Sequence, residues 1–260
     1  MKSLRPLAPF AFALFLFGCM VGCMDRVTEH RVRGNAHARQ GDYVGAITEY
    51  DEGLKGKPDD AATLILKGNA QYELGKLDDA YGSYQKAFAA DAKAADAVRG
   101  MALIATRRAD YVDAATQFER LLSMPQHEHD AATRVNLAKV YLAMGKVDQA
   151  EKQAVEAGHE SGDDEQVLFT LGRVYLAEGK LDEATATFKH LLDTNPSKAS
   201  GACGLALVAA KKGDRSETLK QLTEAMSKGV PDPTAVSKDP AFAAYKEDPE
   251  FVAIATPKSK

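Results

Sequence analysis

The sequence predicts an all-α protein, a right-handed α-solenoid of about six helical hairpins with a short C-terminal helical cap. Two observations carry this fold class. Alanine is abundant, tryptophan is absent, and the alternating Val/Ile/Thr runs typical of strands are missing. A pattern of glycine, polar residue, apolar residue, two further residues and alanine recurs every 34 residues. Such a period is the sequence signature of stacked helical units.

The N-terminal segment has the features of a signal peptide. Two basic residues precede an uncharged apolar run, residues 7–17, that is too short to cross a bilayer as a mature helix. The run ends in Gly-Cys at Cys19, and a second Gly-Cys pair ends at Cys23. This stretch resembles the lipobox of bacterial lipoproteins, whose cysteine is acylated. We expect a lipoprotein signal peptide over residues 1–18 and a short tether over residues 19–26.

The acyl chain, which palmitate would label, is expected on Cys19, with Cys23 as the alternative site. The other interpretation is that both cysteines are inert residues of a plain signal peptide or of a membrane anchor.

The turn between the two helices of each hairpin sets the register of the repeats. Glycine can end a helix in the left-handed conformation without a Cβ penalty. It occupies this turn in five units, at Gly41, Gly75, Gly145, Gly179 and Gly213. Ala109 stands in the same place in the third unit. The predicted units are residues 27–60, 61–94, 95–130 with a lengthened loop, 131–164, 165–198 and the least regular, 199–230.

A 34-residue unit with this pattern resembles the tetratricopeptide repeat, over about residues 27–230. In that family each unit is a helix A, a tight turn and a helix B, with small residues where the two helices approach most closely. The matching places in helix A are Gly34, Gly68, Ala102, Ala138, Gly172 and Ala206. In helix B they are Ala46, Ala80, Ala114, Ala150 and Ala184, with Thr218 as the exception. A larger residue would overpack the crossing.

Residues 231–260 are expected to form a cap and a tail. Two short and similar segments begin with Asp239-Pro240 and Asp248-Pro249. In each, the aspartate suits an N-cap and the proline suits the first helical turn. The aromatic residues that follow, Phe242 and Phe251, would cover the apolar edge that an open array leaves exposed.

No motif for catalysis is convincing, so we expect neither an enzyme nor a cofactor nor a small-molecule substrate. His127 and His129 lie in the lengthened loop and could in principle contribute to a zinc site. Such alternating residues are more typical of a solvated loop. Cys203 is interpreted as a small buried thiol. The formal net charge of -4 gives no indication of nucleic-acid binding.

The resemblance implies a binding groove on a concave face built mostly from helix A. The groove residues expected from their places in the repeat are Arg31, Asn35, Asn69, Tyr72, Arg99, Arg107, Lys139, Phe169, Arg173 and Lys211. This set is mainly basic with apolar residues interleaved. It favours a partner protein that offers an acidic peptide or helix. The alternative is that these are ordinary solvated helix residues.

Together these features predict a membrane-tethered scaffold or adaptor that binds envelope proteins. It would assist assembly of a periplasmic or outer-membrane complex, with its lipid anchor in the outer membrane and its repeats facing the periplasm. The pilotins of type IV pili provide the analogy. The alternative is a non-lipidated exported repeat protein that acts in polysaccharide export, cell division or protease recruitment.

Overall fold

The computed structural model describes residues 25–230 and 232–256. Every regular element in these ranges is a helix, as the sequence predicts. The expected signal peptide and both candidate lipidation sites, Cys19 and Cys23, lie outside the described residues. Within the described ranges, no helix combines the length and the apolar character needed to cross a membrane.

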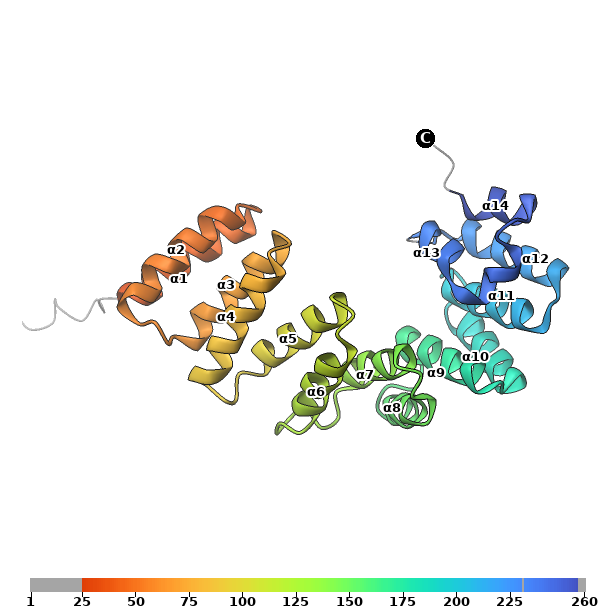
Figure 1. Cartoon of the computed structure of the whole chain (residues 1–260), viewed down its shortest axis with the longest axis horizontal. Helices are drawn as coiled ribbons and strands as arrows, with labels where there is room; N and C mark the ends of the chain where they lie inside the picture. The colour runs from red at the N-terminus through yellow and green to blue at the C-terminus, as the bar shows by residue number, and fades with distance from the viewer. Residues whose placement is uncertain (1–24, 231, 257–260) are drawn as a thin grey trace, which may run out of the picture. The chain divides into compact units, whose positions relative to one another are not determined.

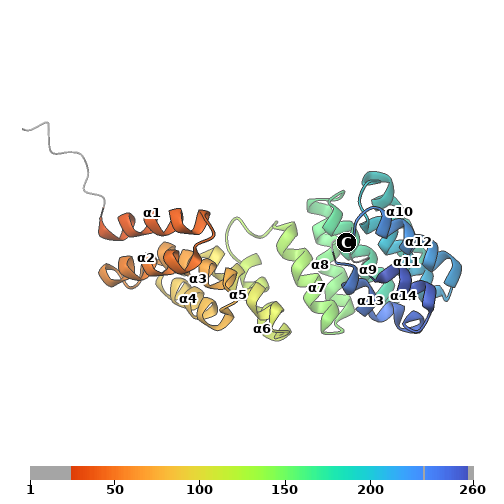
Figure 2. The same cartoon turned by 90° about the horizontal axis from the view of Figure 1, so that it is seen from above.

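Twelve helices of the described chain pair into six consecutive hairpins (Figures 1 and 2). The pairs are α1 (Arg26–Arg39) with α2 (Tyr43–Gly56), α3 (Ala61–Glu73) with α4 (Leu77–Ala90), α5 (Ala95–Arg107) with α6 (Tyr111–Leu122), α7 (Ala131–Ala143) with α8 (Val147–Glu160), α9 (Glu165–Glu178) with α10 (Leu181–Thr194), and α11 (Ser200–Lys212) with α12 (Arg215–Ser227). The hairpins divide between two compact units, of which the first ends at Ala94 and the second begins at Ala95.

The turns within the hairpins adopt the predicted backbone. All five turn glycines have a positive φ, between 71° at Gly145 and 78° at Gly41. Ala109 adopts the same left-handed conformation, with φ 58°, although it carries a Cβ. An L-residue in this region costs roughly 1–2 kcal/mol, so the third hairpin turn is held by its surroundings.

Small residues lie at the helix crossings, as predicted. The helix B alanines are fully buried, and so is Thr218 of α12. Phe188 of α10 shows why size matters here. A Cβ built on Gly172 of α9 would lie 2.5 Å from its ring, and one built on Gly204 of α11 would lie 2.1 Å from it. The fully buried ring therefore fills the space that two glycines leave on the neighbouring helices.

The C-terminal segment, residues 232–256, covers the end of the second unit. It contains α13 (Pro233–Lys238), a 3-10 helix η1 (Pro240–Tyr245) and α14 (Pro249–Ala255). Phe242 and Phe251 are buried with their ring centroids 5.5 Å apart, and they pack against α11 and α12. The predicted cap is thus confirmed. Helix α13 was not predicted, because prolines 231 and 233 indicated a break, whereas Pro233 occupies a first helical turn.

Candidate protein-binding site

The first helices of successive hairpins line a common face within each unit. Contacts join α1 to α3 in the first unit, and α7 to α9 and α9 to α11 in the second. The second helices instead pack between hairpins, as α2 does against α3 and α8 against α9. The helix A side chains that do not face a partner helix are therefore available on one face of each unit. Each unit has a pocket on this face.

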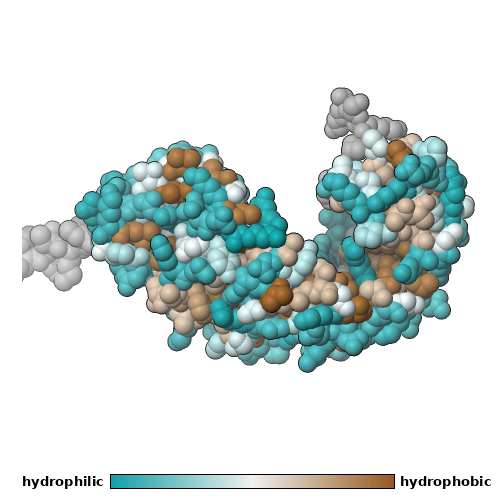
Figure 3. Space-filling model, in the orientation of Figure 1, coloured by the Kyte–Doolittle hydropathy of each residue, from teal (hydrophilic) through white to brown (hydrophobic). Residues whose placement is uncertain are grey.

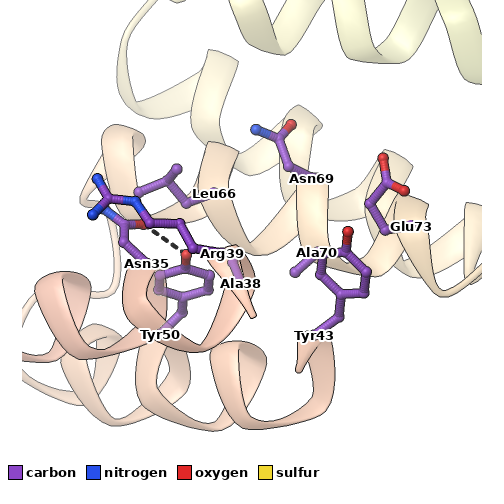
Figure 4. Close-up of a pocket in the computed structure, with 9 residues that line it drawn as sticks. All are labelled: Asn35, Ala38, Arg39, Tyr43, Tyr50, Leu66, Asn69, Ala70 and Glu73. Carbon is purple, nitrogen blue, oxygen red and sulfur yellow. Dashed lines mark hydrogen bonds between the residues drawn. The ribbon is translucent and has the colours of Figure 1, made fainter. Parts of the chain in front are cut away.

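The first unit holds the N-terminal pocket, with a volume of about 340 Å³ (Figure 4). Its lining residues come from α1, α2 and α3 and are Asn35, Ala38, Arg39, Tyr43, Tyr50, Leu66, Asn69, Ala70 and Glu73. The Tyr50 hydroxyl donates to Asn35 Oδ1 at 2.7 Å, which fixes the orientation of that carboxamide. The next hairpin repeats the bond, since Tyr84 donates to Asn69 Oδ1 at 2.6 Å.

The second unit holds the larger C-terminal pocket, with a volume of about 1070 Å³. It lies among the first helices of the fourth, fifth and sixth hairpins and the C-terminal segment. On the visible surface of the second unit, hydrophobic residues lie among hydrophilic ones (Figure 3). Helices α7, α9 and α11 contribute Lys139, Leu142, Ala143, Gln166, Phe169, Thr170, Arg173, Cys203, Ala206 and Leu207, among others. The C-terminal segment contributes Asp232, Ala235, Val236, Asp239 and Phe242. The pocket thus combines apolar walls with a few charged groups, as binding sites generally do.

Two of the cations that line the C-terminal pocket lie on neighbouring first helices, Lys139 on α7 and Arg173 on α9. Lys139 Nζ donates to the neutral Gln166 carboxamide at 2.9 Å. Arg173 lies 3.4 Å from the Asp239 carboxylate. Although Lys139 reaches solvent, the pocket walls remove part of the water around its ammonium group and lower its pKa. Arg173 lowers the pKa further, while Asp164 acts in the opposite direction. An anion near Lys139 would favour the charged ammonium group and so offset both effects.

Comparison with known families decides what kind of protein carries these pockets. Models of the tetratricopeptide repeat match residues 65–132, 105–168 and 165–198. The chain is a tetratricopeptide-repeat protein. The resemblance predicted from the turn and crossing residues is therefore confirmed. No curated protein sequence matches it.

Solved structures show the same fold as this tetratricopeptide-repeat protein. A tetratricopeptide repeat protein from Parabacteroides merdae has a TM-score of 0.77 at 16% identity, over 88% of this chain and 90% of that one. PilW, a widely conserved type IV pilus biogenesis factor, has a TM-score of 0.66 at 15% identity, over 88% and 98%. YrrB, a protein with an unusual peptide-binding site, has a TM-score of 0.56 at 23% identity, over 72% and 95%.

The predicted groove residues of this tetratricopeptide-repeat protein fall into three sets. Asn35 and Asn69 line the N-terminal pocket. Lys139, Phe169 and Arg173 line the C-terminal pocket. The remaining five line neither pocket: Arg31, Tyr72, Arg99, Arg107 and Lys211. Five of the predicted residues therefore line two separate pockets, one on each compact unit. That all ten line a single groove stays a prediction.

Arg31 and Arg99 serve the packing of consecutive repeats. Arg31 of α1 lies 3.3 Å from Asp60, and Arg99 of α5 lies 3.2 Å from Asp130. Each aspartate is the N-cap of the first helix in the next hairpin. These two arginines thus connect one repeat to the next through a capping carboxylate.

Residues of the C-terminal segment were missing from the predicted site. Val236, Asp239 and Phe242 line the C-terminal pocket, although the sequence indicated only a cap. The two Asp-Pro pairs predicted that short helices begin here, but they do not show which surface these helices cover. Cys203, expected to be buried, is only partly buried and lines the same pocket. Burial raises the pKa of its thiol to about 11, so the thiolate is scarce at neutral pH.

The lengthened loop offers no metal site in the part of the chain that the structure describes. His127 lies 3.9 Å from Asp130, while His129 lies 3.4 Å from Glu160 of α8 and is largely exposed. No three His, Cys, Asp or Glu side chains of the described ranges lie close enough together to hold a metal ion. The zinc alternative at His127 and His129 therefore lacks a ligand set.

Proposed function

We propose that this tetratricopeptide-repeat protein is a scaffold that binds other proteins through the faces lined by its first helices. The observation that carries the proposal is the C-terminal pocket, where an apolar floor lies beside Lys139 and Arg173. Such a combination suits a protein segment with a large apolar side chain and a carboxylate. The fold shared with YrrB, which has a peptide-binding site, supports the same class of ligand.

We further propose that the scaffold is tethered to a bacterial envelope membrane and assists assembly of a complex there. The Gly-Cys pairs that end at Cys19 and Cys23 support the tether. The fold shared with PilW, a type IV pilus biogenesis factor, supports a role of the pilotin type at the outer membrane.

Site-specific photo-crosslinking in whole cells tests the scaffold proposal. A photoreactive residue would replace Ala143, an exposed residue at the edge of the C-terminal pocket. The matched control would replace Lys152, which is exposed on α8 of the same hairpin and outside the pocket. We expect a discrete protein adduct from position 143 that position 152 does not give. Equal adducts at both positions, or none at either, would contradict a binding face at the first helices.

Metabolic labelling with palmitate tests the tether. We expect the wild-type chain to incorporate label and the Cys19→Ser variant to lose it. Label that survives Cys19→Ser but is lost in Cys23→Ser would assign the alternative site. An unlabelled wild-type chain would favour the non-lipidated exported protein.

A further inference from the structure

The C-terminal segment contains the motif Asp-Pro-x-Phe twice, and the first copy docks beside the C-terminal pocket. Asp239 accepts a hydrogen bond from the Ala241 backbone N–H at 2.9 Å and thereby begins η1. The same carboxylate lies 3.4 Å from Arg173 of α9. Phe242, three residues later, is 2% exposed and packs on α11. One short turn thus combines a capping carboxylate, a cation on the array and a buried aromatic ring.

The second copy docks in the same manner on the neighbouring helix. Asp248 accepts from the Glu250 backbone N–H at 3.0 Å and begins α14. Arg215 of α12 donates two hydrogen bonds to Asp248, at 2.6 and 3.0 Å. Phe251 is 1% exposed and contacts Phe242. The end of the array therefore binds this motif at two successive places through one set of interactions.

The open part of the C-terminal pocket offers the same set of groups a third time. Lys139 supplies the cation, and the group to which it donates a hydrogen bond is a neutral carboxamide. Phe169 and Leu207 supply apolar surface beside η1. Thr170, which also lines the pocket, is 1% exposed, and its hydroxyl has no hydrogen-bond partner in the described structure. A buried polar group without a partner is costly, so this hydroxyl is a candidate contact for a bound segment.

We infer that the C-terminal pocket binds a short helical turn of a partner protein that resembles the chain's own Asp-Pro-x-Phe turns. Its carboxylate pairs with Lys139, and an aromatic side chain three residues later packs on Phe169 beside η1. The inference rests on the proposed scaffold function and specifies the ligand of one pocket. The C-terminal segment then serves as a wall of the binding site in addition to a cap.

Charge and size support this ligand over a long helix or a basic segment. The partner's carboxylate can pair with the Lys139 ammonium group, which hydrogen-bonds a neutral carboxamide and lines the pocket together with Arg173. The pocket volume of about 1070 Å³ is slightly above the range typical of small-ligand sites. Such a space suits one turn with its anchoring side chain.

Fluorescence anisotropy with a synthetic peptide tests the inference on the full chain. The probe is a fluorescein-labelled peptide with the sequence of residues 237–246, SKDPAFAAYK. Two further peptides replace its aspartate by asparagine or its phenylalanine by alanine. We expect saturable binding of the first peptide, and binding weakened at least about fivefold for each of the others.

Protein variants locate the binding. We expect Lys139→Gln to weaken binding about fivefold, Lys139→Arg to preserve it, and Ala143→Trp to block it by filling the edge of the pocket. Lys152→Gln, on the same hairpin outside the pocket, should leave the affinity unchanged. Circular dichroism of each variant confirms that the helices remain intact.

Two results would overturn the inference. One is the absence of saturable binding to the wild-type chain. The other is an affinity that falls with Arg173→Gln but not with Lys139→Gln, because the peptide would then be replacing the chain's own segment at Asp239. If either occurs while the crosslink from position 143 persists, the scaffold function stands and the proposed recognition element is wrong.

Discussion

At the scale of single residues, helix packing within and between repeats depends on glycines at the closest contacts. Phe188 of α10 lies against Gly172 of α9 and Gly204 of α11. Because the ring is fully buried and lies close to both glycines, an added methyl group would force the ring or a helix to shift. A glycine in the middle of a helix usually lowers stability. At these two positions the close contact with the Phe188 ring requires glycine.

Substituting Gly204 tests this packing directly. We expect Gly204→Ala to lower the free energy of unfolding by about 1–3 kcal/mol through overpacking against Phe188. The control is Gly158→Ala in α8, where an added Cβ meets nothing within 4 Å. That change should raise stability by up to about 1 kcal/mol. Urea denaturation followed by circular dichroism measures both, and a stabilising Gly204→Ala would refute the packing argument.

At the scale of the helix, aspartate caps determine where most of the described elements begin. Asp130 illustrates the mechanism at the start of α7. It accepts from the Thr133 backbone N–H at 3.1 Å and from the Thr133 hydroxyl at 2.9 Å. Arg99 of the preceding hairpin donates to it at 3.2 Å. One carboxylate therefore begins a helix and connects it to the previous repeat.

The Asp130 cap should make stability depend on pH in the acid range. Partial burial opposes ionisation of Asp130, but the hydrogen bonds from Thr133 and the charge of Arg99 outweigh it and lower its pKa. The contribution of this carboxylate to stability is therefore fully present above the ordinary aspartate pKa of about 3.9. It is lost as the pH falls through the lowered value of the folded state.

We expect Asp130→Ala to reduce the free energy of unfolding by about 1 kcal/mol at pH 7. This difference from the wild type should shrink as the pH falls below about 4, and it should vanish below the lowered pKa of the folded state, where the wild-type cap is protonated. Asp130→Asn is the control, since asparagine keeps the cap and loses only the charge. Urea midpoints at pH 7 and pH 3 provide the comparison. A difference that grows on acidification would contradict this account of the cap.

At the scale of the whole molecule, the stability of a repeat array is approximately the sum of the stability of each hairpin and of its contacts with its neighbours. The C-terminal segment ends the second unit because Phe242 and Phe251 cover apolar residues of α11 and α12. In such an array a change at one end should affect the adjacent hairpin most strongly and distant ones little.

Hydrogen exchange can test this locality. We expect Phe251→Ala, which removes a fully buried ring, to cost about 3–5 kcal/mol at the capped end. Amide protection should fall in α11, α12 and α14, while α7 and α8 keep theirs. The control is Val252→Ala, because Val252 is 45% exposed and its truncation should change little. Uniform loss of protection across the second unit would show that it unfolds as one block.

The sequence predicts what is local and repeated, and it fails where contacts are particular to this chain. The turn at Gly41 and the crossing at Gly172 follow from one 34-residue pattern, because each depends on neighbours at fixed distances along the chain. The pair Arg99 and Asp130 joins two hairpins through side chains that both look like surface residues in the sequence. The contribution of Asp239 and Phe242 to the C-terminal pocket depends on how the C-terminal segment folds back, which no repeat pattern contains.

The hydrogen bond between Tyr50 and Asn35, repeated by Tyr84 and Asn69, is closed within a single hairpin. In the first compact unit, each hairpin thus contains both partners of this hydrogen bond, and the neighbouring hairpin contributes neither. A gene that encodes such units can gain one by tandem duplication, and the new copy arrives with its internal bond already complete. The number of repeats in such a protein can therefore change by whole hairpins.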